Sequence, residues 1–290
     1  MTPGHRGEAT TAAGSVLVRG VLAGPVRAAT VVATGPAATY LDVCGRLVAL
    51  VQPGGVHLPC AVVLASPRPS PGQAPAAAAG IAAAGFAVGG GAVHHGGRPT
   101  AVVTRWFDPR VRLGRIDPAA CERLGALVRF RGTPDALLPD GAGEHLRDGL
   151  DRNDARAAAA ALLGRGTGLT PAGDDLLAGA LAALRAQRSP AADALGDAVR
   201  SLAPVRTTRL SAALLDAADA GAVVPEAAAV LRALAPGRRP AGRDGDRALE
   251  AAVDRLVAVG HTSGWHLAAG LLAGLTHARR AAAALVRSAP

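Results

Sequence analysis

The segment 164–175 combines residue types that could hold an anion and move a proton. It reads GRGTGLTPAGDD, a glycine-rich loop followed by the expected start of a helix with two adjacent carboxylates. Glycine permits positive φ and close approach of the backbone to a ligand, and the free N–H groups of a helix start attract anions. We therefore predict that Gly166, Gly168, Thr170 and Gly173 bind an anionic substrate that carries a phosphate or a carboxylate.

The two carboxylates, Asp174 and Asp175, are predicted to be catalytic. Carboxylates in this position can bind a divalent cation, with Mg²⁺ as the candidate cofactor, or accept and donate protons. Successive helical positions point about 100° apart, so at most one of the two faces a given core. The other must find solvent, a cation or a backbone donor. A plain joint between two helices, with acidic residues offsetting the helix dipole, is the alternative.

Known phosphate-binding loops do not fit this segment. No Gly-Lys-Ser/Thr follows the glycines, which excludes a P-loop. A helix rather than a strand is expected before them, which excludes the dinucleotide-binding fingerprint.

A second set of polar residues, 260–266, reads GHTSGWH and also joins two predicted helices. We predict a catalytic role for His261 and substrate contacts for Thr262, Ser263 and Gly264. His261 and His266 are five residues apart, so they lack the i, i+4 spacing of a helical zinc site. A helix stop at the glycine, followed by an ordinary N-cap, is the alternative.

The two segments resemble one another. Residues 173–179 and 264–270 carry Gly, Leu, Ala and Gly at the same offsets. Chance in a chain rich in alanine and glycine is one explanation. The other is a pair of related helices that meet at their starts, where Gly179 and Gly270 permit close approach. A carboxylate and an imidazole across such a cleft could perform acid–base chemistry.

A third candidate is 207–211, Thr-Thr-Arg-Leu-Ser. Hydroxyls at a helix start beside an arginine suit a carboxylate or a phosphate, so Thr207 and Arg209 are predicted to bind substrate. A capped surface helix is the alternative. The pair His94-His95 lies between glycine-rich turns and is predicted to be a solvated loop.

The elements that must position these residues predict an α+β fold, with a mainly β N-terminal domain followed by an α-helical bundle domain. Short β-like runs alternate with Gly/Pro turns before residue 117, and alanine-rich helical patterns follow it. We expect a flexible tail over 1–13, a β-rich domain over 14–116 and a helical domain over 117–290 that carries the glycine-rich loop. The predicted strands are 16–21, 30–33, 39–43, 47–51, 61–64 and 100–107.

Capping signals place the helices of the second domain. Helices are predicted from Pro118, over 154–163, from the Thr170-Pro171 pair, from a cap at Thr207 or Thr208 to Gly221, from Pro225, and over 248–259 and 263–286. Thr170 is the expected N-cap and Pro171 the first helical residue.

Composition bounds the class of protein. Half of the 290 residues are apolar, which excludes a disordered chain. The formal charge of +9 would suit a nucleic-acid binder, but all 31 basic residues are arginine and aromatic residues make up only 2%. GC-rich codon usage explains this pattern better than selection for nucleic acid, whose single strands need aromatic stacking platforms. We expect no nucleic-acid partner.

Cysteine usage and hydropathy favour a cytoplasmic protein. The three cysteines show no CxxC spacing, so we expect buried thiols in a reducing compartment. No apolar segment resembling a signal peptide occurs near Met1. The most apolar stretch, 267–275, is far shorter than the roughly 20 residues of a membrane span.

Several of these motifs occur together in one bacterial family. The pattern Gly-x-Gly-Leu-Thr-Pro-x-Gly-Asp-Asp at 166–175 and Gly-x-Thr-Ser-Gly at 260–264 resemble signatures of the AllH subunit of oxamate carbamoyltransferase. Residues 105–109, Arg-Trp-Phe-Asp-Pro, resemble the family's tryptophan–proline element. Residues 207–211, ahead of an ending at Gly221, resemble its middle element. The motifs occur in the family's order, and the resemblance extends over most of the chain.

The resemblance implies a subunit of a multi-subunit carbamoyltransferase in allantoin (purine) breakdown. Such an enzyme transfers a carbamoyl group between oxalurate and phosphate and forms oxamate and carbamoyl phosphate, so other carbamoyltransferase subunits are the implied partners. It does not say which subunit holds the catalytic groups. The family often has an acidic residue where this chain has His266. A non-catalytic scaffold or carboxylate-binding module of such a complex is the alternative function.

Overall fold

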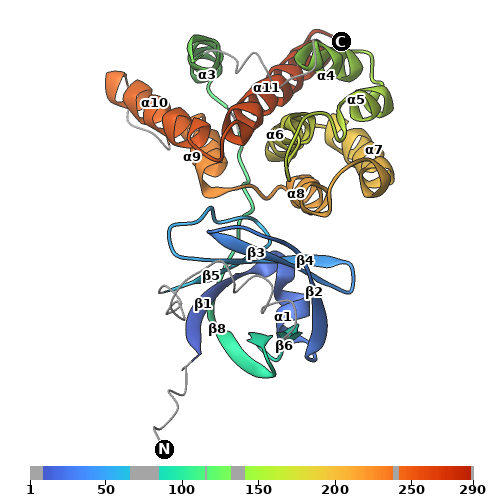
Figure 1. Ribbon diagram of the computed structural model, residues 1–290. Coiled ribbons are helices and arrows are strands. Elements are labelled where there is room, and N and C mark those ends of the chain that lie inside the picture. Colours follow the sequence, from blue (N-terminus) through green and yellow to red (C-terminus); the bar gives the residue numbers. More distant parts are fainter. Residues whose placement is uncertain (1–8, 66–84, 115, 132–140, 238–241, 289–290) are drawn as a thin grey trace, which may run out of the picture. The chain divides into compact units, whose positions relative to one another are not determined.

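The computed structural model describes residues 9–65, 85–114, 116–131, 141–237 and 242–288 (Figure 1). The chain divides into two compact units, Met1–Asp108 and Pro109–Pro290. Residues 1–8 of the predicted N-terminal tail lie outside the described residues. Its last part is ordered, because the first strand begins at Thr10.

The first unit is a closed eight-stranded β-barrel with the strand order β1-β5-β4-β3-β2-β6-β7-β8. Parallel pairing joins β1 to β8 and β4 to β5, and the other neighbours are antiparallel. The strands are β1 (Thr10–Ser15), β2 (Arg27–Thr34), β3 (Ala38–Val43), β4 (Arg46–Val51), β5 (Ala61–Leu64), β6 (Phe86–Gly89), β7 (Ala92–His95) and β8 (Arg98–Phe107).

The predicted fold class needs correction at this point. The first unit is a closed barrel that includes helical turns, rather than a simple mainly β domain, and a set of helices follows it. Closure depends on β1 pairing with β8, whose partners Thr10 and Ala101 lie far apart in sequence. Alternation of apolar residues along a strand predicts which side is buried but not which strand is the neighbour, so this pairing could not be predicted.

Two local predictions in the barrel were also wrong. The apolar run 16–21 is not a strand but the 3₁₀ helix η1 (Val16–Val18) followed by α1 (Arg19–Ala23), because Ser15 accepts a hydrogen bond from the Leu17 amide and caps the turn. His94 and His95 lie in strand β7 rather than in a solvated loop. Glycines at positive φ between β6 and β7 close the hairpin that pairs them.

The second unit is helical, and its capping signals were mostly predicted correctly. Asp117 accepts a hydrogen bond from the Ala119 amide, and Asp154 and Thr208 cap their helices in the same way. The helices are α3 (Pro118–Phe130), α4 (Ala142–Asp151), α5 (Ala155–Leu162), α6 (Ala172–Ala186), α7 (Ala191–Arg206), α8 (Arg209–Asp219), α9 (Pro225–Ala233), α10 (Arg243–Val257) and α11 (Ser263–Ser288). The sequence did not indicate α4 and α7.

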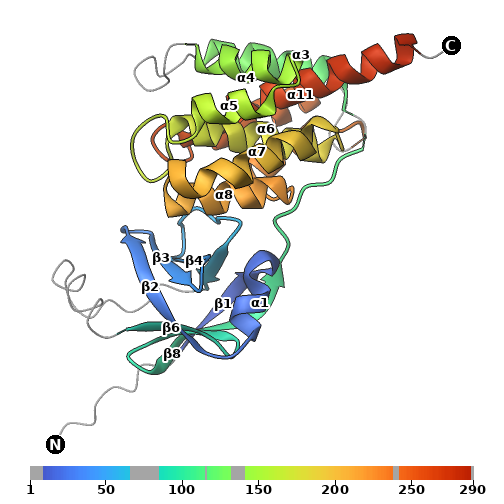
Figure 2. The ribbon, with the colours of Figure 1, turned by 90° about the vertical axis from the view of Figure 1, so that its right-hand side faces the viewer.

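Helix α6 is the centre of this unit. It packs against α5, α7, α8 and α11 (Figures 1 and 2). Nearly every residue of α6 is buried, including Leu177, Leu181 and Leu184, none of which is exposed. A helix that is apolar on all sides needs neighbours all round. The start of α6 is therefore held in place by packing along its whole length.

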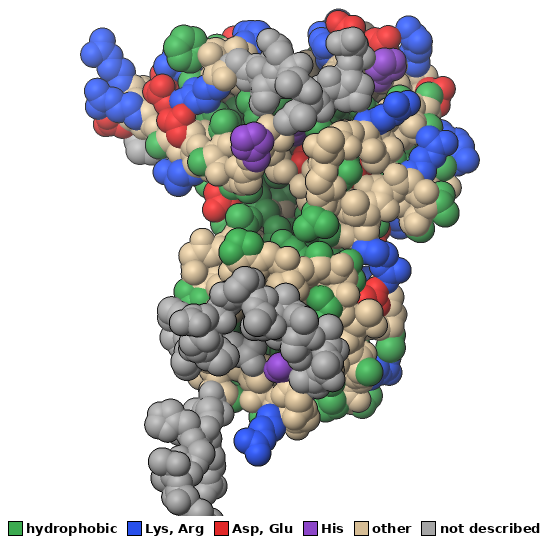
Figure 3. All heavy atoms as spheres, viewed as in Figure 1, with side chains coloured by type: hydrophobic (Ala, Val, Ile, Leu, Met, Phe, Trp, Pro, Cys, Tyr) green, Lys and Arg blue, Asp and Glu red, His purple; other side chains and the backbone are tan. Residues whose placement is uncertain are grey.

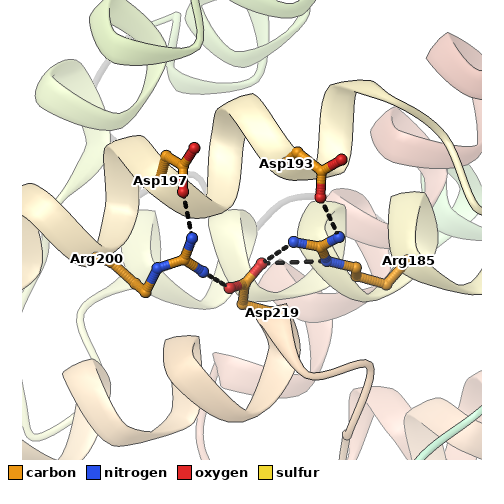
Figure 4. A network of polar contacts seen from close by, with 5 residues as sticks. All are labelled: Arg185, Asp193, Asp197, Arg200 and Asp219. Atoms are coloured by element: carbon orange, nitrogen blue, oxygen red, sulfur yellow. Dashed lines mark hydrogen bonds and ion pairs between the residues drawn. The ribbon is translucent and has the colours of Figure 1, made fainter.

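An ion-pair network joins the end of α6 to α7 and α8 (Figure 4). Arg185 donates to Asp219 through Nε at 3.1 Å and Nη2 at 2.6 Å, and to Asp193 through Nη1 at 2.6 Å. Arg200 also bonds Asp219 and reaches Asp197 on its own helix. Asp219 is the junction, because its side chain is only 10% exposed and accepts from both arginines.

Replacing Asp219 should therefore destabilise the helical unit. An Asp219→Ala variant removes the buried carboxylate that the two guanidinium groups share and leaves each with one exposed carboxylate, so we expect a loss of about 2–3 kcal/mol in the free energy of unfolding. Asp197→Ala removes an exposed carboxylate of the same network and should cost less than about 1 kcal/mol. Urea denaturation measures both, and equal losses would contradict the assignment of Asp219 as the junction.

The surface carries mixed charge, and the cysteines form no disulfide. On the face drawn in Figure 3, arginine side chains of the helical unit are interspersed with acidic ones. The prediction of buried thiols is correct for Cys60 and Cys121 but wrong for Cys44, which is exposed; all three are free. In the described part of the chain, no helix is long and apolar enough to cross a membrane.

Candidate functional site

The glycine-rich loop leads into α6 through three residues at positive φ, Gly164, Gly166 and Gly168. The N-cap of α6 is Pro171 and the helix begins at Ala172, so the predicted cap at Thr170 is wrong by one residue. The Thr170 hydroxyl is instead used by a tertiary contact, a 3.0 Å hydrogen bond with the Ser263 hydroxyl at the start of α11. This hydrogen bond joins the N-terminal end of α6 to the N-terminal end of α11.

Asp174 is the anchor of this loop. Its Oδ1 accepts a 2.8 Å hydrogen bond from the Gly164 amide, and its Oδ2 accepts one from the Thr207 hydroxyl. The side chain is almost fully buried. Burial raises the pKa of Asp174, and the bonds from Thr207 and Gly164 act in the opposite direction. The sequence predicts that one of the two carboxylates binds solvent, a cation or a backbone donor, and for Asp174 this partner is the Gly164 amide.

Asp175 lies in a different environment. It is 5% exposed, and its Oδ2 has no hydrogen-bond partner in the described part of the chain. Burial raises the pKa of Asp175 to about 8; the nearby hydroxyls of Ser263 and Thr170 oppose this rise, and the charge of Asp174 adds to it. Asp175 is therefore a carboxylic acid that carries its proton at neutral pH.

The segment 207–211 comes directly against the loop. Besides the contact of Thr207 with Asp174, the Thr208 hydroxyl donates a 2.6 Å hydrogen bond to the Leu169 carbonyl and accepts the Ser211 amide as the N-cap of α8. The Ser211 side chain is buried, and its Oγ has no hydrogen-bond partner within the described residues. Arg209 is exposed at the start of α8.

The start of α11 forms the other side of the site. Gly260 has a positive φ, but α10 ends at Val257 and its C-cap is Ala258, so Gly260 lies two residues beyond the cap rather than directly after it as predicted. His266 is completely buried and neither ring nitrogen has a hydrogen-bond partner in the part of the chain that the structure describes. Burial lowers the pKa of His266 and favours its neutral form. His261 is exposed.

Helices α6 and α11 cross at the predicted glycine pair. A Cβ at Gly179 would overlap with the Leu267 carbonyl and crowd the Leu271 amide. A Cβ at Gly270 would overlap with the Leu176 carbonyl and crowd the Ala180 amide.

These contacts are reciprocal. Leu176 and Ala180 follow Gly173 by the same numbers of residues as Leu267 and Leu271 follow Gly264. The similarity of the two segments is thus a local two-fold relationship between parallel helices that meet at their starts. In this relationship Asp175 corresponds to His266.

The structure thus brings together the three segments that the sequence singled out. The hydrogen bonds Thr207–Asp174, Thr208–Leu169 and Thr170–Ser263 join them.

Some predicted roles receive less support from the geometry. The amide of Gly173 donates to the Arg165 carbonyl at 2.9 Å, so it is not free for an anion. Ser211 and His266 were not among the predicted site residues, although both stand inside the motifs that flagged the site.

A metal ion finds no ready set of ligands in the described residues, among which no three His, Cys, Asp or Glu side chains cluster closely enough to hold one. A protonated carboxyl is also a poor metal ligand, because metal ligands bind in their deprotonated form. The arrangement at Asp175 fits proton transfer better than metal binding.

Part of the chain is similar to a known protein family. No curated protein and no solved structure matches the chain. A family model does match, over residues 162–275, which run from the end of α5 through the first half of α11 and include all three segments of the site. The resemblance read from the glycine-rich loop is confirmed over this span: residues 162–275 match the family described as oxamate carbamoyltransferase subunit AllH.

Proposed function

We propose that this protein is a subunit of an oxamate carbamoyltransferase-like enzyme and that the paired starts of α6 and α11 form its reaction site. The observation that carries the proposal is Asp175, a buried acid with a pKa of about 8 beside two hydroxyls. A general acid or base works best when its pKa lies near the working pH, and strongly shifted pKa values concentrate at functional sites.

The reaction would need one proton at a defined place. When phosphate takes the carbamoyl group from oxalurate, a phosphate oxygen bonds to the carbamoyl carbon and the bond from that carbon to the oxamate nitrogen breaks. The leaving nitrogen takes up a proton. In this proposal the Asp175 carboxyl donates that proton, and its carboxylate takes one back from oxamate in the reverse direction.

The loop would hold the anionic partner. Gly166 and Gly168 are exposed, and their amides have no hydrogen-bond acceptor in the part of the chain that the structure describes. Negative charge gathers on oxygen during carbamoyl transfer, so fixed N–H donors are the expected stabilisers. Asp174 acts as a positioning residue, since it fixes the loop through Gly164 and Thr207.

Substitution of the acid tests the proposal in the assembled enzyme. With its partner subunits present, an Asp175→Asn variant should lower kcat for carbamoyl phosphate formation about 10²- to 10⁴-fold, because an amide cannot supply the proton. Asp174→Asn should chiefly raise KM for phosphate, since it loosens the loop. Asp148→Asn, which changes an exposed carboxylate of α4, is the matched control and should leave both constants unchanged.

Turnover by Asp175→Asn at the control rate would overturn the catalytic role. A non-catalytic scaffold predicts that outcome together with retained assembly, so co-purification of the partner subunits with each variant is measured alongside turnover.

A further inference from the structure

A cavity of about 530 Å³ lies in the helical unit; its lining includes Leu176 and Trp265, which are neighbours in sequence of the residues of the proposed reaction site. Its walls come from α3, α4 and α11, with Leu176 of α6 contributing one side chain. None of the predicted site residues lines it. Ligand pockets commonly span about 300–1,000 Å³, so the cavity has the size of a site for a small organic molecule.

The cavity has a charged rim of one sign. Arg129 of α3, Arg147 of α4 and Arg280 of α11 line it, and no acidic residue does so among those that the structure describes. Arg280 is partly neutralised by Asp151 at 3.4 Å. Arg147 is oriented by a 2.9 Å bond from its Nε to the Gly143 carbonyl, which leaves both terminal nitrogens without a carboxylate among the described residues. The guanidinium of Arg129 likewise has no ion-pair partner among the described residues.

Apart from Thr276, whose hydroxyl donates to the Leu272 carbonyl, the rest of the lining is mainly apolar and contains a tryptophan. Leu176, Leu272 and the small side chains of Ala269 and Ala273 form an apolar wall beside Trp265. Trp265 is 9% exposed, and its indole N–H is buried without an acceptor in the part of the chain that the structure describes. A buried donor without a partner destabilises the fold, and an acceptor on a bound molecule would remove that cost.

From this combination we infer a second binding site, for an organic anion that joins a flat or apolar body to a carboxylate, phosphate or sulfonate group. The anionic group lies among the Arg129 and Arg147 guanidinium groups, whose paired N–H donors suit oxyanions that accept two hydrogen bonds at once. The apolar body packs against Trp265 and Leu272. The site goes beyond the proposed reaction and does not depend on it.

The test uses a fluorescent probe of this class, 1-anilinonaphthalene-8-sulfonate, on the isolated protein. A Trp106→Phe background leaves Trp265 as the only tryptophan. We expect saturable binding of one probe per chain with energy transfer from Trp265. N-phenyl-1-naphthylamine, which has the same apolar body without the charge, should bind at least tenfold more weakly.

Charge variants make the test specific. Arg129→Gln combined with Arg147→Gln should weaken sulfonate binding about tenfold or more, since each charged hydrogen bond contributes strongly to affinity. Arg123→Gln removes an exposed arginine of α3 that does not line the cavity and is the matched control. Thermal melts verify that every variant is folded.

The inference is overturned by lack of saturable binding, by energy transfer that survives the double substitution unchanged, or by equal weakening in Arg123→Gln. Equal affinity for the uncharged probe would also overturn it, because a merely apolar cavity does not need the arginines.

Discussion

An Asp175→Asn variant should be more stable than the natural chain at neutral and mildly alkaline pH. Burial raises the pKa of Asp175 to about 8, whereas an aspartate in an unfolded chain titrates near 3.9. Between these pH values the folded state binds one proton more than the unfolded state. The free energy of unfolding then falls as pH rises, by about 1.4 kcal/mol per pH unit.

This dependence sets the size and the pH window of the effect. The natural chain and Asp175→Asn should have similar stability near pH 4, where both side chains are neutral. By pH 8 the variant should be more stable by roughly 3–5 kcal/mol. Its amide does not titrate, so folding does not require the uptake of a proton as it does for the carboxyl of Asp175. The hydroxyls of Thr170 and Ser263 can accept hydrogen bonds from the new amide group.

Urea denaturation at pH 4, 6 and 8 measures the effect. Asp148→Asn, at an exposed carboxylate, should show no such divergence with pH. Parallel stability curves for Asp175→Asn and the natural chain would refute the raised pKa. The same variant is expected to lose turnover, so stability and activity should move in opposite directions, as is common where a buried group that destabilises the fold serves function.

Features of this site that depend on residues close together in sequence could be predicted, and features that depend on residues far apart in sequence could not. Caps and glycine stops are local, so the helix starts at Pro118, Ala155 and Arg209 were predicted to within a residue. The pairing of Gly179 with Gly270 was also predictable, because related helices that cross closely need small residues at matching offsets.

Burial was harder to predict, because it depends on neighbours distant in sequence. The rule that adjacent helical residues face different directions did not reveal that Asp174 and Asp175 are both buried. Helix α6 is surrounded, so every direction from it leads into protein. The different roles of the two carboxylates depend on Thr207 and Ser263, which come from other helices. Barrel closure through β1 and β8 is long-range in the same sense.

The crossing of α6 and α11 should be the point of the helical unit that is most sensitive to added volume. A Gly270→Ala variant places a methyl group where the Leu176 carbonyl already lies. Since the overlap is with backbone rather than with a flexible side chain, the helices must separate along their length. Overpacking typically costs 1–3 kcal/mol and occasionally more, and we expect about 3 kcal/mol or more here. Gly179→Ala, its counterpart in the two-fold relationship, should cost a similar amount.

Gly125→Ala in α3 is the matched control for these two variants. Its added methyl would meet only side-chain atoms, the nearest being an Arg129 nitrogen at 3.4 Å and a Leu272 methyl at 3.6 Å. Alanine also favours helix over glycine by about 0.5–1 kcal/mol, so this variant should be neutral or slightly stabilising. Thermal and urea unfolding compare the three.

Because the crossing holds the starts of α6 and α11 together, the two destabilising variants should also break the Thr170–Ser263 contact. The pKa of Asp175 would then fall toward its ordinary range as water reaches it, and the pH dependence of stability would flatten. A Gly270→Ala protein that keeps both its stability and its pH dependence would show that the glycine pair does not set the geometry of the site.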